Sequence, residues 1–263
     1  MRQQYDRTKL FCIALIVLGA LFVSDFVRML EFGRAGTQEG GAVSQAGIRV
    51  EGAVPEAASQ EGEAAPQGDP TVAVYVEGRT PGVWAAAGSG VILDVGEDAL
   101  WIVTAGHVLE RAGEECPVKV KFGEGSTAEC TRYELAADAD LAFLCIFKEA
   151  LPEGCRERTA AKTDKAGYDG LAGGDIVQTM GYRDGEPVIF SGTVSEPWIY
   201  VEDFEQYMLV AACEMDYGMS GGGLYDERGM LIGIVCGANE QGELAAVPLH
   251  VVQARFAELR LQD

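Results

Sequence analysis

Residues 216–237 read DYGMSGGGLYDERGMLIGIVCG and place one serine, Ser220, among four glycines. Glycine adopts backbone conformations that other residues avoid, at a cost in conformational entropy. Such a cluster predicts a loop whose backbone takes an unusual shape or lies close to another group. The apolar runs on either side of DERG, directly behind the glycines, are typical of a short hairpin.

Many short strand patterns flank this loop. They begin with TVAVYVEG at Thr71, include AECTRYEL at residues 128–135 as one strand, and continue, with turns between them, to GELAAVPL near the end. A polar stretch near residues 153–170 divides them into two similar sets, and PLHVVQARFAELRLQ has the apolar spacing of a helix. We therefore predict an all-β domain over residues 71–263, with two β-barrels at about 71–150 and 172–250 and a C-terminal helix.

The bulk composition disfavours several classes of function. The formal net charge of −21 argues against binding to nucleic acid, because nothing neutralises the phosphates. The chain has two histidines and no CxxC pair, so we expect no metal site. The six cysteines after Cys12 would allow three disulfides in an exported domain, and the sequence does not choose between the pairings.

The N-terminal residues have the pattern of a membrane anchor. LFCIALIVLGALFV, residues 10–23, is uninterrupted apolar sequence, and the run can extend to Leu30. Residues 10–30 would span roughly 31 Å as a helix, just enough to cross a bilayer. We predict an uncleaved signal anchor within residues 1–32; a cleaved signal peptide is the alternative, although no good cleavage site follows the run.

The anchor defines an orientation and an arrangement of the chain. Basic residues before the span predict a cytoplasmic N-terminus and a single-pass protein whose main domain lies outside the cytoplasm. Residues 33–70 are rich in Gly, Ala, Glu, Gln and Pro and contain no aromatic residue, so we predict a flexible linker.

Three polar residues stand in contexts that suit nucleophilic catalysis. His107 follows an apolar strand in WIVTAGHVL, Asp140 precedes another in DADLAFL, and Ser220 lies in GMSGGG. A serine hydroxyl needs an adjacent base, and histidine can act as that base when a buried carboxylate fixes its tautomer. Backbone N–H groups near the serine could then stabilise an oxyanion, which explains the glycines.

These motifs resemble those of trypsin-like serine proteases. TAGH, DLAFL and GxSGG stand in the chymotrypsin-fold order of His, Asp and Ser, and GSGVIL, GGDIVQTMGY, SGTVS and AAVPLHVV resemble bacterial HtrA/Deg-type proteases. We expect a member of this type without a PDZ domain. The resemblance covers about residues 71–260. It implies two six-stranded barrels and a serine endopeptidase that acts on proteins or peptides through an acyl-enzyme, without a cofactor.

The resemblance also assigns roles to residues. His107 would be the general base, Asp140 its orienting partner and Ser220 the nucleophile, and the N–H groups of Gly218 and Ser220 would form the oxyanion hole. Asp138 competes with Asp140 for its role, but Asp140 directly precedes LAFL. We expect His250 to be structural and Asp216 to be a solvated loop residue.

Substrate-binding residues follow from alignment with the family. Glu214, six residues before Ser220, falls near the floor of the S1 pocket, and Cys236, Gly237 and Ala238 would form a wall. A buried carboxylate there would favour Lys or Arg at P1; on the Deg-type path Glu214 would face solvent instead. Cys213 and Cys236 flank this region and are one possible disulfide.

One departure from the family keeps a second function open. Met219 stands where digestive trypsins have Asp and Deg-type proteases usually have Asn, so activation of the zymogen type is not expected. The oxyanion loop could rest in an inactive shape until a substrate or partner orders it. The alternative function is therefore a catalytically silent or conditionally active protease-fold ectodomain that binds peptides or senses stress.

Overall fold

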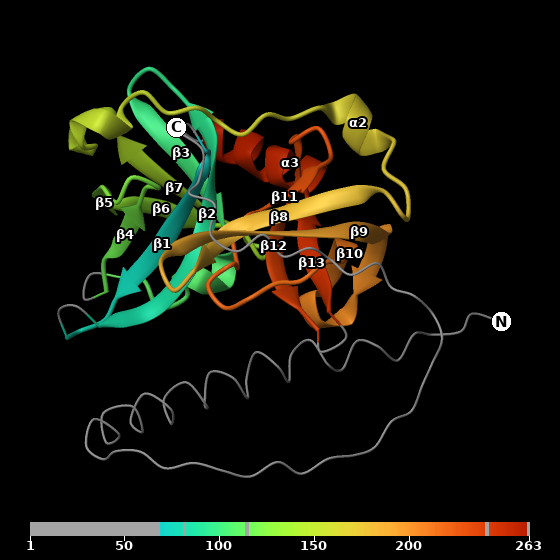
Figure 1. Ribbon diagram of the computed structural model, residues 1–263. Helices are drawn as coiled ribbons and strands as arrows, with labels where there is room; N and C mark the ends of the chain where they lie inside the picture. The colour runs from blue at the N-terminus through green and yellow to red at the C-terminus, as the bar shows by residue number, and fades with distance from the viewer. Residues whose placement is uncertain (1–68, 81–82, 114–115, 240–241, 262–263) are drawn as a thin grey trace, which may run out of the picture.

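The computed structural model describes residues 69–80, 83–113, 116–239 and 242–261 (Figure 1). The predicted anchor lies outside these residues, as does the predicted linker apart from Asp69 and Pro70. Within the described part, no helix is both long enough and apolar enough to cross a membrane.

Short strands dominate the described chain, as the alternating patterns predicted. The first set is β1 (Thr71–Glu77), β2 (Trp84–Val95), β3 (Ala99–Thr104), β4 (Val118–Lys121), β5 (Thr127–Cys130), β6 (Arg132–Leu135) and β7 (Ala142–Phe147). The second set is β8 (Ile176–Arg183), β9 (Glu186–Val201), β10 (Gln206–Ala212), β11 (Gly223–Asp226), β12 (Leu231–Ala238) and β13 (Glu243–Pro248). The helices are η1 (Gly106–Leu109), η2 (Lys148–Ala150), η3 (Glu153–Cys155), α2 (Lys165–Asp169), η4 (Glu202–Phe204) and α3 (Leu249–Arg260).

The second set closes into the predicted six-stranded barrel, in the order β10-β13-β12-β11-β8-β9. The first set differs from the prediction, because it is a seven-stranded sheet in the order β5-β4-β1-β2-β3-β7-β6 and its pairing is open. AECTRYEL, expected as one strand, is divided at Thr131 into β5, which pairs with β4, and β6, which pairs with β7. One straight strand cannot reach both partners, so the chain bends between them.

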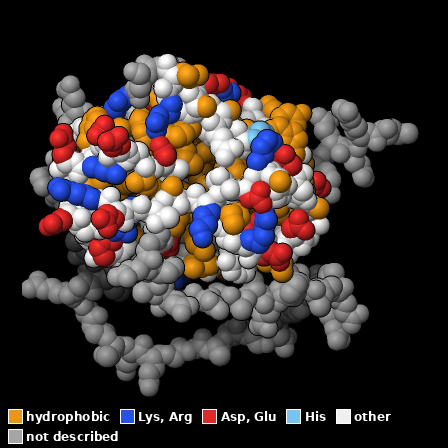
Figure 2. All heavy atoms as spheres, turned by 90° about the horizontal axis from the view of Figure 1, so that it is seen from above, with side chains coloured by type: hydrophobic (Ala, Val, Ile, Leu, Met, Phe, Trp, Pro, Cys, Tyr) orange, Lys and Arg blue, Asp and Glu red, His pale blue; other side chains and the backbone are white. Residues whose placement is uncertain are grey.

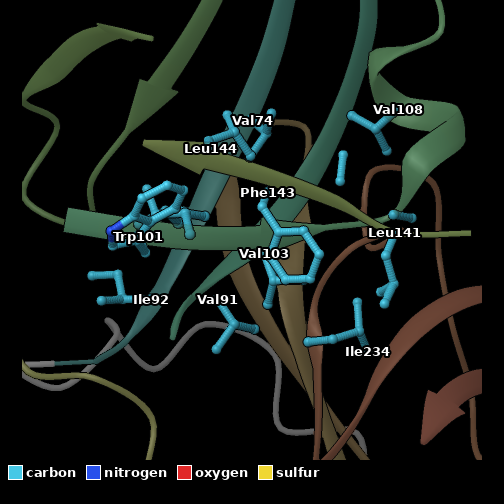
Figure 3. Packing of buried hydrophobic residues seen from close by; sticks show 14 of the residues in the cluster. Val74, Val91, Ile92, Trp101, Val103, Val108, Leu141, Phe143, Leu144 and Ile234 are labelled. Atoms are coloured by element: carbon cyan, nitrogen blue, oxygen red, sulfur yellow. The ribbon is translucent and has the colours of Figure 1, made fainter. Parts of the chain in front are cut away.

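The two halves share a hydrophobic core (Figure 3). Trp101 of β3 and Phe143 of β7 lie in it together with Ile234, which comes from β12 of the second barrel. Helix α3 adds Phe256, whose ring lies 5.6 Å from the ring of Trp101 and 5.7 Å from that of Phe143, centroid to centroid. The C-terminal helix, predicted from its spacing, therefore joins the barrel to the sheet.

The six described cysteines are free thiols, so the three disulfides that an exported domain would allow are not formed. Their sulfurs pack separately. The Cys213 thiol donates a hydrogen bond to the carbonyl oxygen of Phe190, and the Cys236 thiol contacts the carbonyl oxygen of Asp140. Cys213 and Cys236 thus bind different groups and do not pair with each other.

Candidate active site

His107 and Asp140 meet at the junction between the sheet and the barrel. His107 lies in η1, which begins two residues after the end of β3, and Asp140 lies two residues before the start of β7, which pairs with β3. The Asp140 carboxylate accepts the His107 backbone N–H at Oδ1 (2.9 Å) and lies 2.8 Å from the ring Nδ1 at Oδ2. Because the carboxylate only accepts at Oδ2, Nδ1 carries the hydrogen and Nε2 is left as the basic nitrogen.

The other polar residues considered from the sequence lie elsewhere. Asp138 is exposed and pairs with Arg255 of α3 at 2.6 Å, so it does not contact His107. His250 lies at the start of α3, where its Nδ1 is 3.1 Å from the hydroxyl of Tyr168. The structure thus selects Asp140 over Asp138 as the histidine's partner and keeps His250 away from the site.

The charge states of the pair support each other. Burial alone lowers the pKa of His107, but the hydrogen bond and charge of Asp140, with a smaller effect of Glu110, raise that pKa above its usual value. Burial alone raises the pKa of Asp140, but its contacts with His107 and Cys236 lower the pKa below its usual value. The carboxylate is therefore ionised at neutral pH and stabilises a proton on the imidazole.

Ser220 lies on the loop between β10 and β11, which packs against the residues beside His107. A Cβ on Gly221 would clash with Ala105 N and with the side chain of Thr104, so the loop approaches the end of β3 as closely as glycine permits. The φ angles of Gly218 and Gly221 are +90° and +86°, a region that other residues avoid. The glycines are therefore required here both for the unusual backbone conformation of the loop and for its close approach to β3.

Ser89 of β2 fixes this loop, a role that no sequence motif predicted. Its N–H donates to the carbonyl oxygen of Ser220 (2.7 Å), and its hydroxyl donates to that of Gly218 (2.7 Å). The same hydroxyl accepts the N–H of Tyr182 (2.8 Å), and its own carbonyl oxygen accepts the hydroxyl of Thr104 (2.6 Å). The only signal in the sequence was the Gly-Ser-Gly context of GSGVIL.

The backbone N–H groups expected to form an oxyanion hole are available. Within the described part of the chain, neither Gly218 N–H nor Ser220 N–H donates to a protein acceptor, whereas Gly221 N–H and Met219 N–H do. Met219 is fully buried in the core of the second barrel. Its sulfur accepts the N–H of Asp216 at 3.3 Å, which holds the base of the loop.

Cys236 connects Ser220 to Asp140. Its carbonyl oxygen accepts the Ser220 hydroxyl at 3.3 Å, and its thiol contacts Asp140. Among the described residues, this carbonyl and not His107 is the hydrogen-bond partner of the Ser220 hydroxyl. Burial, with the nearby Asp140 charge, raises the pKa of Cys236 well above its usual value, so its thiol stays protonated and is not a nucleophile.

A cavity of about 260 Å³ lies beside this loop. Glu214 and Ala238 line it, together with Arg183, Phe190, Met215, Asp216, Asn239 and Gly242. Of the four substrate-binding residues expected, Cys236 and Gly237 are absent from this lining. Glu214 is exposed, as on the Deg-type path. Asp216, expected to be a plain loop residue, pairs here with Arg183 at 3.3 Å.

The order of these residues along the chain agrees with a known family. The family model for the trypsin-like peptidase domain matches residues 88–234, more than half of the chain. This chain belongs to the trypsin-like peptidase domain family. The matched segment of this peptidase domain contains His107, Asp140 and Ser220. A search of the curated proteins found no match.

The arrangement contains the groups that acyl transfer by a serine nucleophile requires. It combines a serine, an imidazole with a basic Nε2, an ionised carboxylate and two available N–H groups. Among the described residues, no group of three or more His, Cys, Asp or Glu side chains is placed to hold a metal ion.

Proposed function

We propose that the protein is a membrane-anchored serine endopeptidase in which Ser220 is the nucleophile, His107 the general base and Asp140 the group that orients His107. The observation that carries this proposal is the Asp140–His107 pair, with both carboxylate oxygens engaged, beside a serine loop whose Gly218 and Ser220 N–H groups are available. Membership of the trypsin-like peptidase family supports it.

In the proposed reaction, the Ser220 hydroxyl releases the Cys236 carbonyl and passes its proton to Nε2 of His107 while Oγ attacks the substrate carbonyl. The Gly218 and Ser220 N–H groups bind the resulting oxyanion. His107 then gives the proton to the leaving amine, the C–N bond breaks, and an ester to Ser220 remains. Water, activated by the same imidazole, hydrolyses that ester and restores the hydroxyl.

A fluorophosphonate probe tests the nucleophile without knowledge of the substrate. We expect the full chain to be labelled, and Ser220→Ala to be unlabelled although folded. Ser195→Ala, which changes a partly buried serine outside the site, is the matched control and should label normally. Equal labelling of the Ser220→Ala variant, or none of a folded parent, would count against an active Ser220.

The second candidate function is a conditionally active peptidase. It is favoured by the hydrogen bond of the Ser220 hydroxyl, which goes to the carbonyl oxygen of Cys236 and not to His107. In this form a bound peptide would have to release the Ser220 hydroxyl from the Cys236 carbonyl. It would also have to bring the serine loop, which Met219 anchors, into its active conformation. Met219→Asn tests the point. Faster labelling of that variant, with its folding verified, supports a resting state that Met219 holds; an unchanged rate argues against it.

Specificity at P1 is the finer part of the proposal. Glu214 lines the cavity, and the other carboxylate there, Asp216, already has Arg183 as a partner. We propose that the Glu214 carboxylate gives a moderate preference for Lys or Arg at P1, weakened by its exposure to solvent. A peptide library that shows a preference for small aliphatic P1 residues, unchanged in Glu214→Gln, would overturn this assignment.

We also propose that residues 10–30 anchor the chain, with the N-terminus in the cytoplasm and the peptidase domain outside it; the apolar run and the basic residues before it support this. Carbonate extraction of membranes should leave the full chain in the pellet and release a chain that starts at residue 33. Release of the full chain would refute the anchor.

A further inference from the structure

An aromatic surface lies on the β9–β10 hairpin, away from the candidate site. Trp198 and Tyr200, two residues apart on β9, lie on the same face, and Tyr207 of β10 pairs directly with Tyr200. The three side chains, here called the hairpin aromatic surface, are 47%, 48% and 49% exposed. Figure 2 shows hydrophobic side chains gathered at the second-barrel end of the molecule.

The rings of this surface hold one another in place. Trp198 and Tyr207 are stacked, with centroids 4.9 Å apart and planes 6° from parallel, and Tyr200 meets Tyr207 edge to face at 5.4 Å. His250 of α3 packs against Trp198 at 4.7 Å. Ordered aromatic rings lose little entropy on binding, which is one reason why Trp and Tyr are enriched where proteins bind partners.

The charged residues of the hairpin itself are all acidic. Residues 194–210 contain Glu196, Glu202, Asp203 and Glu205 and no lysine or arginine. The neighbouring Lys165 is paired with Asp169 at 2.9 Å. Burial, with the charge of Lys165, lowers the pKa of His250, so its imidazole is neutral at neutral pH.

Half-exposed Trp and Tyr rings beside the acidic residues of the hairpin, here called the acidic rim, attract cations. Arginine and lysine gain cation–π energy over Trp and Tyr, and carboxylates pair with their charges. Anionic lipids repel carboxylates, so the acidic rim would oppose docking on a membrane surface that contains such lipids. We propose that the hairpin aromatic surface is a docking site for an arginine- or lysine-rich polypeptide segment.

This docking site is separate from the cavity beside Ser220. β10 ends at Ala212 and leads from the hairpin toward that cavity, and Glu214 lies seven positions after Tyr207. At about 3.3 Å per residue, seven positions of extended chain span roughly 23 Å. A cationic segment on the hairpin therefore leaves the cavity free, and its binding does not depend on catalysis.

Fluorescence anisotropy with a labelled hexa-arginine peptide tests the proposal. The full chain is used in a neutral detergent and carries Ser220→Ala, so that the peptide is not cut. Tyr200→Ala should weaken binding about fivefold, the loss of one cation–π contact, and Trp198→Ala should act in the same direction. Replacing Glu202 and Glu205 with Gln should weaken binding and flatten its salt dependence.

Two matched variants make the test specific. Trp84→Ala removes an aromatic side chain that is 45% exposed on the first sheet, where Lys119 already lies over the ring, and it should not change binding. Glu134→Gln, which removes an exposed carboxylate on β6 of the first sheet, should not change it either. Three outcomes would overturn the proposal. An equal loss of peptide binding in Trp84→Ala would mean diffuse attraction, and a loss of binding confined to Glu214→Gln would place the peptide in the cavity. If Tyr200→Ala weakened only the binding to phosphatidylcholine vesicles, the surface would be a membrane contact.

Discussion

Replacing Asp140 with asparagine should inactivate the protein through the tautomer of His107. Asp140 accepts two hydrogen bonds, one from the His107 backbone N–H (2.9 Å) and one at Nδ1 (2.8 Å). Asparagine has one acceptor oxygen and an NH₂ group. The backbone N–H can only donate, so it takes the oxygen and leaves the NH₂ facing Nδ1. Nδ1 must then accept, and the proton moves to Nε2, where it blocks the base.

The magnitude of this effect is large for activity and small for stability. A wrong tautomer of this kind costs about 10⁴-fold in kcat, which is roughly 5.5 kcal/mol in activation free energy. Loss of one charge-assisted hydrogen bond lowers the free energy of unfolding by about 1.5–3 kcal/mol. The variant should therefore remain folded while it loses activity.

The second-order rate constant of fluorophosphonate labelling measures the loss without a known substrate, and thermal unfolding checks the fold. Asp138→Asn is the matched control, because Asp138 lies two residues away in an exposed pair with Arg255. It should leave the labelling rate unchanged and cost about 0–1 kcal/mol in stability. A folded Asp140→Asn variant that labels within tenfold of the parent would refute the assigned role of Asp140.

Three further outcomes are expected. The labelling rate should fall as pH falls through the pKa of His107, because the imidazole must be neutral to act as a base. Asp140 raises this pKa above 6.5 against the effect of burial. A midpoint of the pH–rate profile below 6.5 would therefore contradict the pairing of His107 with Asp140. Gly221→Ala should lower stability by about 1–3 kcal/mol and abolish labelling, whereas Gly229→Ala, with φ +72° and open space around it, should keep labelling. Met219→Ala should lower the free energy of unfolding, measured with a denaturant, by about 2–5 kcal/mol, because Met219 is fully buried. Met230 is only half-buried, so an equal loss in Met230→Ala would contradict this reasoning.

Most of the fold could be predicted because the strands are short, regular and separated by turns. The prediction failed at AECTRYEL, because its alternation continues through Thr131 while the pairing partner changes from β4 to β7. The cysteines were also uninformative, because spacing does not report which sulfurs approach each other. Their local hydrogen bonds to carbonyl oxygens appear only when the chain is folded.

By itself, the sequence determined the class of fold, the family and the three polar residues in their order, because motif spacing and side-chain chemistry are local properties. Only the tertiary structure decided which aspartate meets His107, that Ser89 and Cys236 hold the serine loop, and that Cys236 and Gly237 stay out of the cavity. These facts depend on contacts between residues far apart in the chain. Such contacts are fixed by how the sheet and the barrel pack against each other through their shared core, and no local pattern records that packing.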